Sequence, residues 1–121
     1  DGLVVQTQDV VEMHWDQTFE WCGRADWVIN SGGVKLFPER IEEKIRHCVS
    51  LPFAVHGVSD ALLGSKAVLF IESEPWSALQ MADLMQHIKT ILPALECPRE
   101  IRFVSHFERT SSGKIKRQSL L

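Results

Sequence analysis

Short hydrophobic runs separated by polar residues make up the first part of the chain. Residues 3–5, 10–13 and 19–22 are such runs, rich in β-branched and aromatic side chains. The third alternates apolar and polar positions, as a strand with one buried face does. This pattern predicts a small antiparallel β-ribbon over residues 1–22.

The next twenty residues combine several signals. Residues 23–26 are a polar break, residues 27–29 (Trp-Val-Ile) are typical of a strand, and residues 31–33 (Ser-Gly-Gly) predict a turn. Pro38 suits the first turn of a helix. One interpretation is an ordinary strand–turn–helix connection, and the other is a glycine backbone that a ligand passes closely.

A helix is predicted after Pro38 from the spacing of its apolar residues. Ile41, Ile45 and Val49 recur every four residues and form one stripe, and a proline at position 52 ends the helix. Glu42 and Arg46 stand four residues apart in the favourable order, so we expect them to pair.

The second half of the chain alternates strands with a longer helix. Residues 54–58 and 67–71 are predicted strands joined by a turn at residues 63–66, and the second is apolar enough to be central. Residues 100–104 alternate as another strand. Between them a helix begins near Pro75 or Ser77 and ends before Pro93. Its apolar stripe consists of Met81, Leu84, Met85, Ile88, Ile91 and Leu92.

These elements predict an α+β fold. It is a small two-layer domain with an N-terminal β-ribbon and a mixed sheet of about three strands packed by helices. A length of 121 residues suits one domain, and the net charge of −3 argues against a nucleic-acid-binding protein. No apolar run reaches the roughly 18 residues of a membrane span. The chain begins without Met and without a signal-peptide pattern, so we expect a fragment of a longer protein.

Cysteine, histidine and tryptophan residues give further expectations. Three widely spaced cysteines favour reduced thiols and a cytoplasmic location. The histidines and cysteines lack the spacing of a metal site, so none is expected. Four tryptophans could form either an exposed docking patch or ordinary core packing.

A basic segment, Arg-Thr-Ser-Ser-Gly-Lys-Ile-Lys-Arg, occupies residues 109–117. It fails the Walker pattern because Glu108 and Ile115 stand where glycine and Ser or Thr are needed. What remains is Lys114 on a glycine-containing tether. It is either part of a frayed basic terminus or an ammonium group that reaches an anionic oxygen in a site formed elsewhere.

Two stretches together resemble the C-terminal domain of the adenylate-forming acyl/aryl-CoA ligase and luciferase superfamily. Residues 23–42 are similar to the pattern Gly-Arg-x-Asp…Gly…Ile-Glu, and residues 109–117 to Thr-x-x-Gly-Lys-x-x-Arg. Residues 7–9 (Thr-Gln-Asp) are similar to Thr-Gly-Asp, with Gln8 in place of glycine. Within the superfamily, residues 28–42 look most like o-succinylbenzoate–CoA ligases.

The resemblance implies roles for the residues that match. Lys114 would drive the adenylation half-reaction, in which a carboxylate attacks the α-phosphate of ATP and an ammonium group stabilises the developing charge. The other implied roles are contacts with the nucleotide ribose for Asp9 and Arg24, the hinge for Asp26, and the passage of CoA for Gly32 and Gly33.

Two departures from the superfamily pattern affect these roles. Asn30 stands where many relatives carry lysine, so any role of that lysine is lost. Glu108 stands where proline is usual, which alters the stiffness of the loop.

The resemblance also implies a division of the chain and a function. Residues 1–22 would end a large N-terminal adenylation domain, the expected partner, and residues 23–121 would be a mobile C-terminal lid. The function would be ATP-dependent acid–CoA ligation, with ATP and Mg²⁺ bound mainly by the N-terminal domain and CoA as co-substrate. The acid would be o-succinylbenzoate of menaquinone biosynthesis, and the isolated lid would be inactive. Another aryl or fatty acid, or a non-catalytic docking module of the same fold, are the alternatives.

Overall fold

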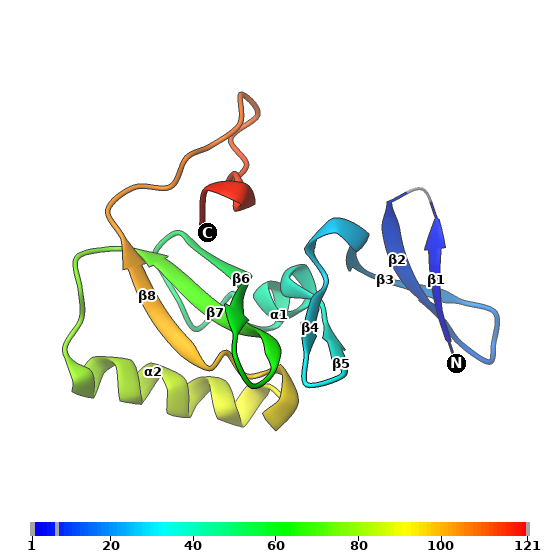
Figure 1. Cartoon of the computed structure of the whole chain (residues 1–121), viewed down its shortest axis with the longest axis horizontal. Helices are drawn as coiled ribbons and strands as arrows, with labels where there is room; N and C mark the ends of the chain where they lie inside the picture. The colour runs from blue at the N-terminus through cyan, green and yellow to red at the C-terminus, as the bar shows by residue number, and fades with distance from the viewer. Residues whose placement is uncertain (1, 7, 121) are drawn as a thin grey trace.

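A three-stranded antiparallel ribbon opens the chain and lies at one end of the molecule (Figure 1). The computed structural model describes residues 2–6 and 8–120, so Thr7 of the Thr-Gln-Asp match lies outside the described residues. The strands are β1 (Gly2–Gln6), β2 (Asp9–Met13) and β3 (Phe19–Arg24). The predicted ribbon is confirmed, and its third strand extends to Arg24, which is the register partner of Asp9.

A tight hairpin replaces the single strand predicted at residues 27–29. A 3-10 turn, η1, covers Ala25–Trp27, and the strands β4 (Ile29–Ser31) and β5 (Val34–Leu36) follow it. Gly32 and Gly33 have φ values of 57° and 83°. Positive φ at both central residues is what a two-residue hairpin turn requires, so the glycine pair specifies a hairpin and a second strand that the prediction omitted.

Helix α1 (Pro38–Ile45) begins at the predicted proline. It ends before Val49, which is buried from the following segment. The expected pair of Glu42 with Arg46 is wrong. Arg46 bonds the exposed Glu43 at 3.1 Å, whereas Glu42 faces inward and pairs with Arg117.

The second sheet has five strands rather than about three, because the β4–β5 hairpin joins it. Strand β7 (Gly64–Glu72) is central, as predicted. It pairs along its length with antiparallel β6 (Phe53–Asp60), and its other edge is shared by parallel β8 (Glu100–Val104) and by β4 through Ser31 and Gly64. The turn expected at residues 63–66 lies earlier, since Gly64 already begins β7.

Helix α2 (Ala78–Ile91) begins at a capping box. The Ser77 hydroxyl accepts a hydrogen bond from the Gln80 amide, and the Gln80 side chain accepts one from the Ser77 amide. Leu84 and Ile88 of the predicted stripe are buried, whereas Ile91 is exposed. A short turn, η2 (Ala94–Glu96), leads to β8. No described helix is long and apolar enough to cross a membrane.

Strand β7 buries side chains on both faces. Leu69 and Ile71 pack in the larger core with α1 and α2, while Val68 and Phe70 face the other way. That second face is covered by the C-terminal segment, which contributes Phe107 and, from η3 (Arg117–Leu120), a buried leucine at position 120. In Figure 1, α2 lies on one side of the sheet and the C-terminal segment on the other. A frayed C-terminus is therefore the wrong interpretation.

His56 is a buried histidine on β6, with only 6% of its surface exposed. Its ring and that of Trp27 are packed in a T-shaped arrangement with centroids 5.9 Å apart, and Nδ1 has no hydrogen-bond partner among the described residues. The pKa of His56 is lowered mainly by burial and further by the positive charge of Arg117. Folding therefore favours the neutral form of this histidine.

We predict that His56 makes the stability of the folded chain depend on pH. Because its pKa is lower in the folded than in the unfolded chain, unfolding takes up a proton, and stability falls as the pH drops through about 6.5. The melting temperature should decline less between pH 7.5 and 5.5 for His56→Phe than for the wild type. His87→Gln, on the exposed face of α2, is the control. Parallel curves for the wild type and His56→Phe would contradict the prediction. The pKa of Glu100 is lowered to about 2 by hydrogen bonds from Arg102 and Lys66, so its titration affects stability only at a lower pH than this range.

Candidate functional site

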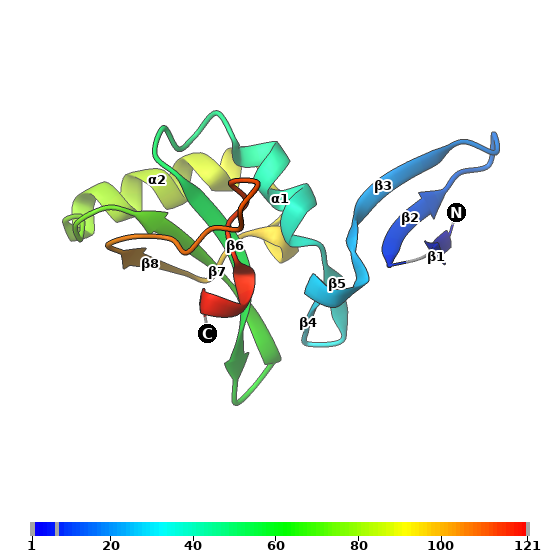
Figure 2. The same ribbon diagram turned by 90° about the horizontal axis from the view of Figure 1, so that it is seen from above.

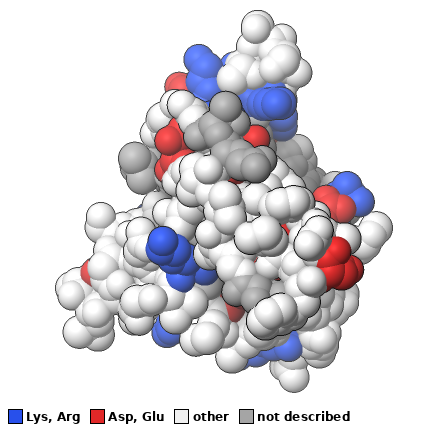
Figure 3. Space-filling view, turned by 90° about the vertical axis from the view of Figure 1, so that its right-hand side faces the viewer, with Lys and Arg blue, Asp and Glu red and all other residues white. Residues whose placement is uncertain are grey.

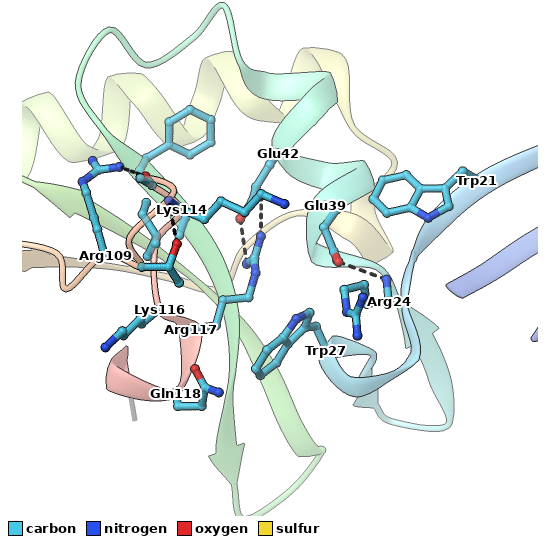
Figure 4. A pocket seen from close by; sticks show the side chains of 15 residues that line it. Trp21, Arg24, Trp27, Glu39, Glu42, Arg109, Lys114, Lys116, Arg117 and Gln118 are labelled. Carbon is cyan, nitrogen blue, oxygen red and sulfur yellow. Dashed lines mark hydrogen bonds and ion pairs between the residues drawn. The ribbon is translucent and has the colours of Figure 1, made fainter. Parts of the chain in front are cut away.

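A cavity of about 580 Å³ lies between the ribbon end, helix α1 and the C-terminal segment. Five basic side chains and two carboxylates line it, so we call it the basic cavity. Figure 4 shows the ribbon residues on one side, the C-terminal residues on the other and the α1 carboxylates between them. The charged lining consists of Arg24, Arg109, Lys114, Lys116 and Arg117, with Glu39 and Glu42.

Lys114 lies in a closed hairpin rather than on a loose tether. Arg109 and Ile115 form a β-bridge, and the Thr110 amide donates to the Lys114 carbonyl at 2.7 Å. Gly113 has a φ of 90°, which closes the turn. Lys114 is exposed, and its ammonium makes no ion pair with the described residues. The hairpin therefore presents a charged amine that can meet an anion.

Arg117 closes the base of this hairpin. Its guanidinium donates to both carboxylate oxygens of Glu42, at 2.8 and 2.9 Å, and to the Val55 carbonyl at 2.8 Å. Glu42 also accepts the Val55 amide at 2.7 Å. Burial alone would lower the pKa of Arg117, but the hydrogen bonds and charge of Glu42 outweigh it and raise that pKa. The bond between Glu42 and Arg117 was not predicted from the sequence. The two matched patterns nevertheless end on these residues, the first on Glu42 and the second on Arg117.

Arg24 is held on the ribbon side of the cavity. Its backbone amide donates to Glu39 at 3.0 Å, and its guanidinium contacts Gln8 and lies 3.8 Å from Asp26. Asp9 is its register partner across β2 and β3. The structure thus brings Asp9, Arg24 and Asp26 together, and of these Arg24 lines the same cavity as Lys114.

The glycine pair lies elsewhere. Gly32 and Gly33 form the β4–β5 turn, where the Gly32 amide donates to the Leu63 carbonyl at 2.9 Å. In Figures 1 and 2 this turn is well separated from the Lys114 hairpin. The residues singled out in the sequence therefore fall into two groups on different parts of the surface.

Three side chains of types that can bind a metal ion lie close together on the ribbon, although their spacing in the sequence does not match a metal-binding motif. Single ligand atoms of Glu12, His14 and Glu20 all lie within 4.8 Å of one another. The Arg40 guanidinium lies 3.4 Å from Glu12 and 3.2 Å from Glu20 and compensates both carboxylates. The group is thus an ion-pair network, and cross-strand pairing of Glu12 with Glu20, rather than linear spacing, creates it.

Two tryptophans pack against other rings and two are exposed. Trp27 packs on His56 and Trp76 on Phe103. Trp15 and Trp21 are exposed on the ribbon, and Figure 3 shows how much of the molecular face at that end is uncharged. The other large hydrophobic residues exposed on the ribbon strands are Leu3, Val5, Met13 and Phe19.

Relatives of known identity share both sequence and fold with this chain. It is 32% identical over 120 residues to the mitochondrial acyl-coenzyme A synthetase ACSM5 of Mus musculus, covering 94% of this chain and 21% of the relative. The crystal structure of an acyl-CoA synthetase (AMP-forming)/AMP-acid ligase II-like protein from Dyadobacter fermentans is 36% identical, with a TM-score of 0.72 over 95% of this chain and 34% of that one.

A further solved structure shares the fold alone. The o-succinylbenzoate CoA synthetase of Bacillus subtilis, in complex with its acyl-adenylate intermediate, has a TM-score of 0.79 at 22% identity, over 95% of this chain and 24% of that one. The chain spans about a fifth of the length of the curated relatives it matches.

A family model described as the AMP-binding enzyme C-terminal domain matches residues 52–114, which is more than half of the chain. The match includes β6, β7, α2, β8 and the hairpin up to Lys114. With the relatives above, it shows that this chain belongs to the family of AMP-binding enzyme C-terminal domains.

Proposed function

We propose that this chain is the mobile C-terminal lid of an AMP-forming acid–CoA ligase. Residues 23–121 form the lid, and residues 1–22 lead into it from a large N-terminal adenylation domain. The observation that carries the proposal is that Arg24 and Lys114, about ninety positions apart in the sequence, line one basic cavity. Such a cavity suits a polyanion such as a nucleotide.

In the first half-reaction the acid carboxylate attacks the α-phosphate of ATP, the acyl–phosphate bond forms and pyrophosphate leaves. Two anions meet, so a nearby cation lowers the barrier. Lys114 supplies that cation, since lysine keeps its charge at neutral pH, while Arg24 and Asp9 contact the ribose. The five basic groups of the cavity suit anions, and we assign no Mg²⁺ ligand to this chain.

In the second half-reaction the CoA sulfur attacks the acyl carbonyl, and AMP leaves. This step needs a narrow passage rather than a lysine. We assign the passage to Gly32 and Gly33, with rotation of the lid about Asp26. The separation of the glycine turn from the Lys114 hairpin supports an exchange of faces, and Asp26 lies in the short exposed turn η1 between ribbon and hairpin.

The acid and the compartment are narrower proposals. The run at residues 28–42 favours o-succinylbenzoate, and hence menaquinone biosynthesis. The 32%-identical relatives are named as acyl-coenzyme A synthetases, and a 28%-identical one as a medium/long-chain fatty-acid ligase, which favours a fatty acid as the alternative. All three thiols are free, which supports the cytoplasm. The curated mammalian relatives are mitochondrial by name.

We predict that the full-length enzyme forms AMP with o-succinylbenzoate and CoA at a kcat/KM at least about tenfold above that for octanoate, a gap of roughly 1.4 kcal/mol. Release of AMP with each acid measures the preference. A reversed order would replace o-succinylbenzoate with a fatty acid while leaving the ligase proposal intact.

We predict that Lys114→Ala in the full-length enzyme slows acyl-adenylate formation by about 10²–10³-fold, because one electrostatic contact in the transition state is lost. Thioester formation from supplied acyl-adenylate should be unchanged. The two half-reactions are measured separately by rapid quench, with Lys89→Ala on the exposed face of α2 as the control. An equal loss in both half-reactions would refute the role of Lys114.

We predict the opposite pattern for Gly33→Leu. A side chain in the passage should slow thioester formation at least about tenfold, roughly 1.4 kcal/mol of barrier, and spare adenylate formation. Leucine is also strained at a φ of 83°, so Gly33→Ala, which carries the same backbone strain with much less side-chain bulk, is the matched control. If both variants slow thioester formation equally, backbone strain explains the loss and the passage is misplaced.

A further inference from the structure

Two carboxylates of one short helix hold opposite sides of the basic cavity. Glu39 accepts the backbone amide of Arg24 at 3.0 Å, and Glu42 accepts two hydrogen bonds from Arg117. They stand three residues apart on α1, hence on neighbouring positions of one face and about 4.5 Å apart along its axis. Helix α1 therefore sets the distance between the ribbon end and the C-terminal hairpin (Figure 4).

The hairpin that carries Lys114 is closed by its own hydrogen bonds, so its orientation depends on what holds its two ends. Beyond the Arg109–Ile115 bridge, the Lys116 amide donates to the Glu108 carbonyl at 2.7 Å. At the first end Phe107 is buried, and its amide donates to Glu72 at 2.9 Å. At the second end Arg117 is the polar anchor, and Leu120, three residues further along, is buried in the smaller core.

The hydrogen bonds of Arg117 fix the orientation of its side chain. Three hydrogen bonds tie its guanidinium to α1 and β6, and the side chains of Arg117 and Glu42 are only 15% and 20% exposed. A planar guanidinium matches a carboxylate with two parallel bonds, whereas a lysine ammonium in its place would keep the charge and lose the fork.

We infer that Arg117 is a positioning residue for adenylate formation: through Glu42 and the Val55 carbonyl it fixes the hairpin so that the Lys114 ammonium faces the cavity that Arg24 lines. This inference rests on the proposed function, because that function gives Lys114 its role. Arg117 acts through the position of Lys114 and needs no contact with the reacting atoms.

The test is a double-variant cycle in the full-length enzyme. Arg117→Lys should slow acyl-adenylate formation on the order of 10²-fold, the cost of a misplaced group, and leave thioester formation from supplied adenylate unchanged. Combined with Lys114→Ala it should cost nothing further, because the group that it positions is gone. Glu42→Gln should give the same pattern. Additive losses, or equal losses in both half-reactions, would overturn the inference.

A second readout does not depend on activity. Trypsin should cut after Lys114 and Lys116 faster in Arg117→Lys than in the wild type, because the hairpin loses an anchor. Arg46→Lys, which alters an exposed ion pair with Glu43, is the matched control. Cleavage no faster than in this control would overturn the anchoring. If Lys114→Ala leaves adenylate formation intact, the proposed function fails, and the cleavage rates still decide whether Arg117 anchors the hairpin.

Discussion

Burial of strand β7 on both faces is the constraint on which the rest of this domain depends. A strand with two apolar faces needs a cover on each, and here the covers come from different parts of the chain. Helices α1 and α2 pack over Leu69 and Ile71, and the C-terminal segment packs over Val68 and Phe70. Because the second cover is irregular backbone, it can both close the core and carry a polar hairpin to the cavity.

Helix α1 joins these two requirements. Its apolar stripe, Ile41 and Ile45, lies in the larger core, while Glu39 and Glu42 face the cavity. One side of this eight-residue helix packs in the core, and the other side binds the ribbon end and the C-terminal hairpin. The pairing of Glu42 with Arg117 also explains why Arg46, the neighbour expected from helical spacing, bonds Glu43 instead.

Local patterns predicted most of the elements but fewer of the contacts. The ribbon, both helices and the central position of β7 could be predicted from the spacing of apolar residues. Pro38 and Ser77 additionally mark where the two helices begin, because each affects only the first turn of its own helix. The turn at residues 31–33 was predicted from its Ser-Gly-Gly sequence, but the hairpin around it was missed, because the three-residue strands β4 and β5 carry little periodicity. The site was predicted in part, since the patterns include Arg24 and Lys114, but a linear pattern does not say that Glu42 and Arg117, 75 positions apart, bond each other.

The cover that the C-terminal segment lays over β7 has a consequence for biosynthesis. Phe107 and Leu120 complete the smaller core, yet they follow the last residue of β7, Glu72, by 35 (107 − 72) and 48 (120 − 72) positions. As the polypeptide leaves the ribosome, β6 and β7 can already pair, and the surface of Val68 and Phe70 stays open to solvent until residue 120 has cleared the exit tunnel. Nascent chains stalled before residue 120 has emerged expose a hydrophobic sheet surface, which makes them targets for chaperones and prone to aggregation.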